Sequence, residues 1–448
     1  MFGCNNNKLT SLDVSQNKKL QMLYCSGSDL TPTNRIASLD LTGLTDLEHV
    51  ECQNNGMNTL ILGSHPNLSL LYCYGNNIPT LNIGGAPVIK DAYLNGTHDA
   101  GQYFEHYHTE DGNLKIDGTT DVICDSSYIM SFNVSLSGKL YFRAFTVPNE
   151  QMLDDDGAYF AISYTDASVR NAPVIKTDND LIKNAPTNTH SSGVVRRTFE
   201  KRFFIAQLHD EVSYELYDHN GYQQPLYRMI NNSYAGNGNT VVSTPWEYLE
   251  GRIANSTDPK MVELAKAIEY YGTAAQLYFG YNTEDIPSSA LTALNTAIGS
   301  SSVTSGLAAY DAVKTGTLPA GIEKYTSSLV VESDHSFVYH FYLDGSKSIS
   351  NYSFYIDFKD GKGYTKVTPV KEATNKYCIQ VSDIPSGYLS RTYKFKVTGG
   401  SQTIEISASA LSYAYGRVLN STNPNMVKMA KALYLYSMAA NAYFGTGN

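Results

Sequence analysis

Hydrophobic positions in the first hundred residues follow one recurring template. The segments Leu20–Leu30 and Leu68–Ile78 both read L-x-x-L-x-C-x-x-[NS]-x-[LI], with Leu and Cys alternating with polar or aromatic residues. The cysteines of successive turns are 21 residues apart, except for one gap of 27 residues that holds an insertion. These cysteines are Cys4, Cys25, Cys52 and Cys73. A turn this short cannot close its own core, so the pattern predicts turns that stack with the cysteines packed inward.

The template resembles the cysteine-ladder internalins and related leucine-rich-repeat surface proteins of Gram-positive bacteria, whose turns read LTxLxCSxNxLTxLDVSxN. The resemblance covers residues 1–97 and includes the second half-repeats LTSLDVSQN and IASLDLTGL. It implies a leucine-rich-repeat solenoid that is incomplete at its N-terminus, because Met1 already lies inside a turn. It also implies an extracellular or cell-surface protein, although this chain carries no signal peptide.

The residues that flank the inward Leu and Cys in each turn are expected to face outward on the concave sheet. Tyr24, Tyr72 and Tyr93 form one column there, with Glu51 in place of a fourth tyrosine. Tyrosine offers broad contact area and a hydroxyl, which suits protein epitopes and sugar faces. The predicted ligand-binding residues are Met22, Tyr24, Glu51, Gln53, Tyr72, Tyr74, Asp91 and Tyr93. The alternative is that tyrosine only satisfies strand propensity at these positions.

Residues 98–125 lose the period, and we expect a β cap over the last turn. His106 and His108 could share one face of a strand there and are weak candidates for a metal site. An exposed polar cap strand is the favoured explanation for both, so no metal is expected. Asp154, Asp155 and Asp156 before Gly157 are typical of a solvated turn, since the spacing of a calcium loop is absent.

A duplication follows the repeats. Residues 251–280 and 416–445 match at 17 of 30 positions without a gap. Each segment predicts a helix that starts at an Asp or Asn cap followed by Pro, and that ends at Gly. Upstream of each helix, short runs of alternating polarity predict a β-sandwich. The duplicated segments resemble modules of large surface proteins of Gram-positive gut and rumen bacteria.

These patterns predict a mixed, multidomain fold, with a leucine-rich-repeat solenoid followed by two β-sandwich-plus-helical-hairpin units. The expected domains are the solenoid (1–97), its β cap (98–125), the first copy (126–280), a linker with short helices (281–320) and the second copy (321–448).

Composition narrows the function. Only 17% of the residues are charged and the net charge is −10, so the chain has no basic surface for nucleic acid. The 35 Tyr against one Trp are typical of exported β-rich proteins. No apolar run is long enough to span a membrane, and the chain contains none of the common catalytic motifs. No cofactor and no catalytic residue are expected.

The sequence therefore predicts a non-enzymatic, secreted or cell-surface binding or adhesion protein, whose partner is a protein or glycan on a host or neighbouring cell. The alternative is a carbohydrate-binding accessory protein that acts through the duplicated units. An enzyme is the least favoured interpretation.

Overall fold

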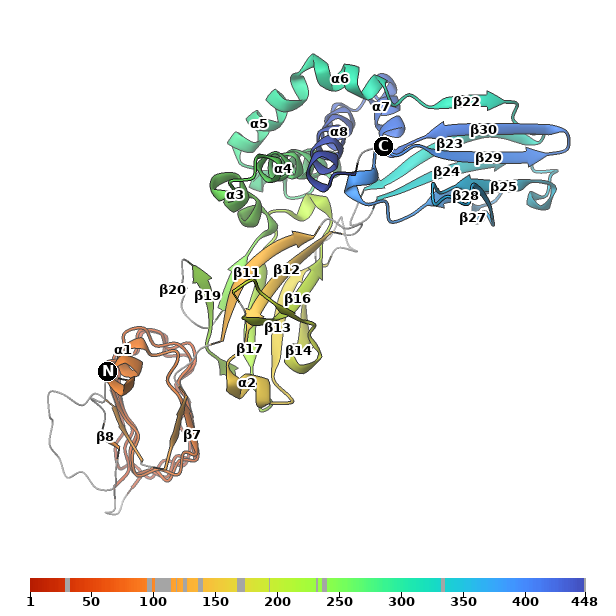
Figure 1. The fold of residues 1–448 in the computed structure, drawn as a ribbon. Helices are drawn as coiled ribbons and strands as arrows, with labels where there is room; N and C mark the ends of the chain where they lie inside the picture. Colours follow the sequence, from red (N-terminus) through yellow and green to blue (C-terminus); the bar gives the residue numbers. More distant parts are fainter. Residues whose placement is uncertain are drawn as a thin grey trace.

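The computed structural model describes the chain apart from residues 29–32, 95–98, 101–113, 118, 124–126, 136–139, 167–173, 193, 231–232, 236–239, 332–334 and 447–448. Its parts follow one another along the chain: short parallel strands, the two sheets of the first copy, a group of helices, the two sheets of the second copy and the last two helices (Figure 1).

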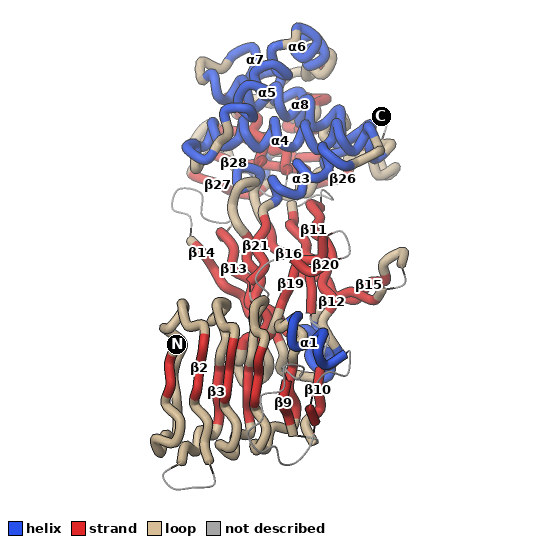
Figure 2. Tube along the Cα trace, turned by 90° about the vertical axis from the view of Figure 1, so that its left-hand side faces the viewer, coloured by secondary structure: helices blue, strands red, loops and turns tan. Residues whose placement is uncertain are grey.

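Short parallel strands make up the N-terminal part (Figure 2). One sheet contains, in spatial order, β1 (Phe2–Gly3), β2 (Met22–Tyr24), β4 (His49–Glu51), β6 (Leu70–Tyr72), β9 (Leu114–Ile116) and β8 (Asp99–Ala100). Two smaller parallel pairs are β3 (Ser38–Asp40) with β5 (Thr59–Ile61), and β7 (Thr80–Asn82) with β10 (Asp121–Ile123). Helix α1 (Pro87–Leu94) follows β7 in the chain.

This part has a hydrophobic core of its own. The middle residues of successive strands, Leu23, Val50 and Leu71, pair in register and are fully buried. The residues on either side of each point to the other face, because side chains alternate along a strand. The hydrophobic effect therefore fixes which residues of these short strands remain accessible.

Two sheets pack face to face in the first copy. The first contains, in order, β15 (Thr187–Thr189), β16 (Val195–Arg202), β12 (Tyr141–Val147), β11 (Ser127–Ser135), β19 (Leu226–Ile230) and β20 (Ser233–Ala235). The second contains β14 (Ile175–Leu181), β13 (Tyr159–Thr165), β17 (Val212–Tyr217) and β18 (Gln223–Gln224), with β21 (Thr240–Ser243) also paired to β17. Ring contacts between Phe160 and Phe199, 4.7 Å apart, join the two sheets.

The second copy repeats this strand order. One sheet is β23 (Ile322–Val331), β24 (His335–Leu343), β28 (Lys376–Val381) and β27 (Val370–Ala373). The other is β22 (Val313–Gly316), β30 (Gln402–Ala408), β29 (Tyr393–Gly399), β25 (Ser353–Asp357) and β26 (Tyr364–Val367). Phe337 and Phe395 join the two sheets with ring centroids 5.6 Å apart. The order β15-β16-β12-β11 thus corresponds to β27-β28-β24-β23, which extends the duplication from the helices to the sheets.

The longer helices are α3 (Pro245–Asn255), α4 (Pro259–Phe279), α5 (Ser288–Gly299), α6 (Ser301–Ala308), α7 (Ala410–Asn420) and α8 (Pro424–Phe444). The short helical elements are α2 (Glu150–Asp154), η1 (Ile182–Asn184), η2 (Ile205–Gln207), η3 (Thr283–Asp285), η4 (Ile349–Asn351) and η5 (Ser386–Tyr388).

The predicted ends of the two duplicated helices are confirmed. Asp258 caps α4 by accepting a hydrogen bond from the backbone N–H of Lys260 at 2.9 Å, and Asn423 caps α8 in the same way. Gly280 and Gly445 end the helices in the left-handed conformation, at φ of 65° and 66°, which favours glycine because it has no side chain to clash.

The two copies share one hydrophobic core. Helix α4 of the first copy packs along α8 of the second, and the buried residues of both pairs of sheets belong to one continuous cluster. Figure 1 shows these two helices side by side, with α5 and α6 arching from one copy to the other.

The fold class predicted from the sequence, a mixed fold with a leucine-rich-repeat solenoid followed by two β-sandwich-plus-helical-hairpin units, is wrong. The chain is a multidomain β-rich protein, in which several parallel and antiparallel sheets predominate and helices are few. The N-terminal strands of two or three residues are divided among separate sheets. The helices of the two copies pack on each other rather than closing two separate units, because each leaves an apolar stripe that the other covers.

Candidate functional site

The outward face of the N-terminal parallel sheet places the predicted binding residues in rows. Tyr24 pairs with Glu51, and Glu51 pairs with Tyr72, in consecutive strands. A second row joins Met22 to His49. Paired residues of neighbouring parallel strands lie about 5 Å apart, so these side chains form one continuous surface.

Tyr24, His49 and Glu51 form the best-defined cluster on this face. The Nε2 atom of His49 lies 2.9 Å from Oε1 of Glu51, and the His49 ring is 5.1 Å from the ring of Tyr24. The side chains of His49 and Glu51 are 21% and 18% exposed, so the pair is accessible but partly shielded from water. The cluster therefore offers a ring, a carboxylate and an imidazole in a fixed arrangement.

Tyr74 and Gln53 lie beside this cluster. Tyr74 is half-buried, and burial together with the negative charge of Glu51 raises the pKa of its hydroxyl. Gln53 is also half-buried, and its Oε1 atom has no hydrogen-bond partner among the described residues. The neutral phenol of Tyr74 adds a hydrogen-bonding group to the face, whereas the unpaired oxygen of Gln53 is itself buried and is not accessible there.

Tyr72 is buried, contrary to the expectation that it exposes its ring. Only 7% of it is accessible, and the ammonium group of Lys115 lies 4.6 Å from the ring centroid. Lys115 belongs to β9, which pairs with β6 and extends the same row. The face is therefore covered at Tyr72, and its accessible part lies around β2 and β4.

Asp91 and Tyr93 do not continue the row. Both lie in α1, whereas the sequence predicted a strand for them. Pro87 favours the first turn of a helix, because its fixed φ suits that position and its missing N–H is not needed there. The place of the predicted strand beside β6 is taken by β9.

The four ladder cysteines are buried free thiols. Cys25 and Cys52 are fully buried, Cys73 almost so, and Cys4 is 9% exposed. Burial raises the pKa of Cys25 to about 12, with a smaller effect from Cys4, and raises the pKa of Cys73 as well. These groups therefore stay protonated, and since the thiolate is the reactive form, they are packing residues.

Buried asparagines form a second ladder that the sequence analysis missed. Asn76 Oδ1 accepts hydrogen bonds from the backbone N–H groups of Asn55 (3.1 Å) and Met57 (2.9 Å), and its Nδ2 donates to the carbonyls of Cys52 (3.2 Å) and Cys73 (2.7 Å). Asn55 and Asn34 make similar bonds one turn and two turns earlier. The [NS] position of the repeat template was the available signal for Asn55 and Asn76, whereas between Cys25 and Cys52 that position holds Ser28 and Asn34 follows it. This ladder satisfies backbone groups that the short strands leave unpaired.

The weak metal candidates His106 and His108 lie outside the described residues. Within the part of the chain that the structure describes, no group of three or more His, Cys, Asp or Glu side chains could hold a metal ion. Of the acidic run, Asp155 accepts a hydrogen bond from the N–H of Gly157 at 2.9 Å and lies 3.0 Å from Nδ1 of His219. It acts as a turn residue.

Ser328, His340 and Glu372 meet on the outer face of the second copy. Ser328 Oγ lies 2.7 Å from His340 Nε2, and His340 Nδ1 lies 2.6 Å from Glu372 Oε2. This is the order of groups in a nucleophile, base and acid relay. None of the three lines either of the two cavities described in the structure. Lys376, 3.2 Å from Glu372, adds a charge that turns the group into a polar network linking β23, β24, β28 and β27.

No protein-family model matches the chain, and no curated protein sequence matches it. Among the described residues, no helix combines the length and the apolar character needed to cross a bilayer.

Proposed function

We propose that the protein is a non-enzymatic, secreted or cell-surface binding protein that recognises a protein or glycan through the outward face of β2 and β4. The observation that carries this proposal is the Tyr24, His49 and Glu51 cluster, held on a sheet with a buried core behind it. The resemblance of the cysteine-spaced template to Gram-positive surface proteins supports the extracellular location.

The cluster suits recognition because its parts are already ordered. The 2.9 Å contact between His49 and Glu51 and the ring contact with Tyr24 restrict all three side chains before a ligand arrives. Binding then costs less conformational entropy than it would on a loop. Tyrosine is also among the residues that contribute most to binding energy in well-packed interfaces.

The test uses the full chain and two variants, Tyr24→Ala and Glu51→Gln. Binding is measured to cultured epithelial cells and to a printed glycan array, with thermal unfolding to confirm folding. We expect each variant to bind at least about tenfold more weakly with little change in Tm, since each removes about 1.4 kcal/mol or more of contact energy. Attachment equal to that of the unchanged protein would rule out this face.

A second candidate function, carbohydrate binding through the duplicated region, has its own supporting observation. Tyr159 and Tyr217 stack with ring centroids 5.3 Å apart and an interplanar angle of 11°, and both are half-buried on the same sheet. The Tyr217 hydroxyl donates to Glu215 at 2.8 Å. Paired rings beside a carboxylate are suited to a sugar ring. Tyr159→Ala therefore serves as the matched control: selective loss of glycan binding in this variant favours the second function over the first.

A further inference from the structure

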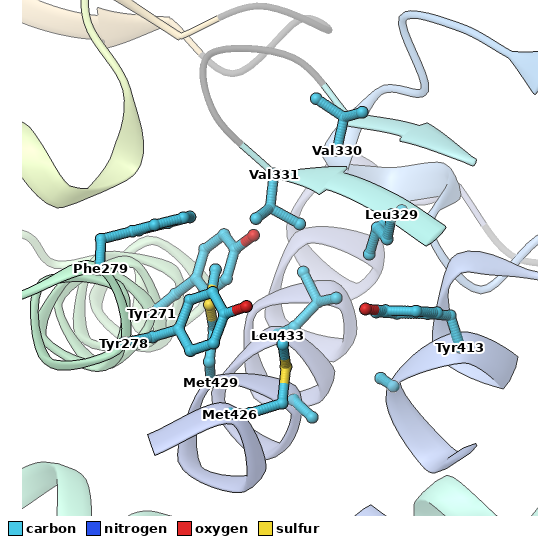
Figure 3. Close-up of a pocket in the computed structure, with 12 residues that line it drawn as sticks. Tyr271, Tyr278, Phe279, Leu329, Val330, Val331, Tyr413, Met426, Met429 and Leu433 are labelled. Atoms are coloured by element: carbon cyan, nitrogen blue, oxygen red, sulfur yellow. The ribbon is translucent and has the colours of Figure 1, made fainter. Parts of the chain in front are cut away.

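A cavity of about 260 Å³ lies where the two copies meet (Figure 3). Its walls come from α4, from β23 and from the neighbouring helices α7 and α8, three distant parts of the sequence. Helix α4 of the first copy contributes Tyr271, Tyr278 and Phe279. The second copy contributes residues of β23, α7 and α8, among them Leu329, Tyr413, Met426 and Leu433. The cavity therefore exists only because the copies are joined.

The cavity is partly open to solvent, because Tyr278, Phe279, Val330 and Met426 on its walls are only half-buried. For comparison, an apolar cavity of about 150 Å³ is enough to admit benzene. At about 260 Å³, this cavity has room for a ring system larger than benzene. Most of its lining residues are apolar, but polar atoms make up a large part of the accessible lining surface.

The chemistry of the lining favours an aromatic guest. Met426 and Met429 place two thioethers on one wall, and methionine sulfur makes favourable contacts with aromatic rings. Figure 3 shows the rings of Tyr271 and Tyr278 on one side and Tyr413 on the other, with the Tyr413 hydroxyl directed toward Leu433. Burial raises the pKa of Tyr413 more than the charge of Arg417 lowers it, so the hydroxyl stays neutral and can donate or accept a hydrogen bond.

We infer that this cavity binds a small aromatic molecule of one or two rings that carries a hydroxyl or N–H group. The rings pack between the methionines of α8 and the tyrosines of α4, and the polar group pairs with the hydroxyl of Tyr413. A bound molecule touches both copies at once and therefore stabilises their association.

The experiment titrates the full chain with 2-naphthol by isothermal calorimetry. We expect one saturable site per chain and a rise in Tm with 2-naphthol concentration, because the ligand binds only the folded state. Met426→Trp fills the cavity and should weaken binding at least tenfold. Met261→Trp is the matched control, since Met261 holds the equivalent position in α4, is also half-exposed and does not line the cavity.

A second variant tests the polar contact independently of cavity filling. Tyr413→Phe removes only one hydroxyl and should weaken 2-naphthol by about fivefold while leaving naphthalene binding unchanged. The inference is overturned if 2-naphthol shows no saturable binding, or if the two tryptophan variants bind it equally well. It is also overturned if Tyr413→Phe affects 2-naphthol and naphthalene alike, because the hydroxyl would then have no part in recognition.

Discussion

Tyr271 and Tyr436 occupy equivalent positions in the two copies and stack on each other, with ring centroids 5.3 Å apart and an interplanar angle of 18°. Both are essentially fully buried, and the ring of His335 lies 6.1 Å from each. One residue that the duplication repeated thus contacts its own counterpart where the two copies meet.

Tyr271→Ala should lower the free energy of unfolding by about 3–5 kcal/mol, the usual effect of deleting a buried aromatic ring. Because the core is continuous, both copies should lose stability together in a denaturant titration followed by circular dichroism. Tyr415→Ala, at a half-buried site on α7, is the control and should cost much less. A loss confined to the first copy would contradict the shared core.

The buried imidazole of His65 should make stability depend on pH. Burial lowers the pKa of His65 to about 4, and its Nε2 atom has no partner among the described residues. As the pH falls below about 6.5, His65 binds a proton in the unfolded chain but not in the folded chain. The contribution of neutral His65 to the free energy of unfolding is therefore fully present above pH 6.5. It decreases by roughly 3 kcal/mol as the pH falls to about 4.

His65→Leu should remove that loss. Leu44 holds the equivalent position 21 residues earlier, so leucine suits the site. The Leu44 carbonyl, which lies 3.0 Å from Nδ1 of His65, also accepts the N–H of Leu47 at 3.0 Å and stays bonded. Unfolding curves of the N-terminal part at pH 7.5 and pH 4.5 check the prediction, and an unchanged difference between the two would refute it.

Buried Glu269 should make stability depend on pH in the direction opposite to His65. Burial, and to a lesser extent the charge of Glu250, raises the pKa of Glu269 to about 8, and its Oε1 atom has no partner in the described part of the chain. The folded protein holds this proton between about pH 4.5 and pH 8, so the contribution to stability falls as the pH rises through that range.

Glu269→Gln should therefore raise Tm by a few degrees at pH 9 and leave it almost unchanged at pH 4. Glu263→Gln is the matched control on the same helix, because Glu263 is 67% exposed and pairs with Lys266 at 3.0 Å. Equal shifts in the two variants at pH 9 would show that burial of Glu269 has no effect on stability.

The asparagine ladder should be essential to the N-terminal part. Asn76→Ala removes five hydrogen bonds and leaves buried backbone groups unpaired, at about 1–3 kcal/mol each, so we expect a total loss of about 3–5 kcal/mol. Asn77→Ala changes an exposed neighbour and should have little effect. Urea unfolding followed by circular dichroism compares the two, and similar midpoints would contradict a structural role for the ladder.

The features that could be predicted from the sequence were those that depend on neighbouring residues. The caps at Asp258 and Asn423 and the terminal glycines act within a few residues, so the sequence alone places α4 and α8. The burial of the cysteines follows from a strict period. Helix α1 was missed although Pro87 marks its start, because the repeat pattern was extended one turn too far.

Contacts between distant segments could not be predicted. The pairing of α4 with α8 depends on contact between two apolar stripes from distant parts of the chain. Each stripe alone indicates that one helix face is buried, but it does not identify the element that covers it. Ser328, His340 and Glu372 come together from three strands whose register depends on the packing of the whole sheet. The burial of Tyr72 likewise depends on β9, which joins the sheet from 42 residues further along the chain.

The pairing of α4 with α8 also sets the order of events on the ribosome. While the chain is being synthesised, α4 emerges well before residues 424–444, so the face around Tyr271 stays uncovered until α8 follows. A nascent chain stalled in that interval exposes the apolar face of α4 to other nascent chains and to chaperones.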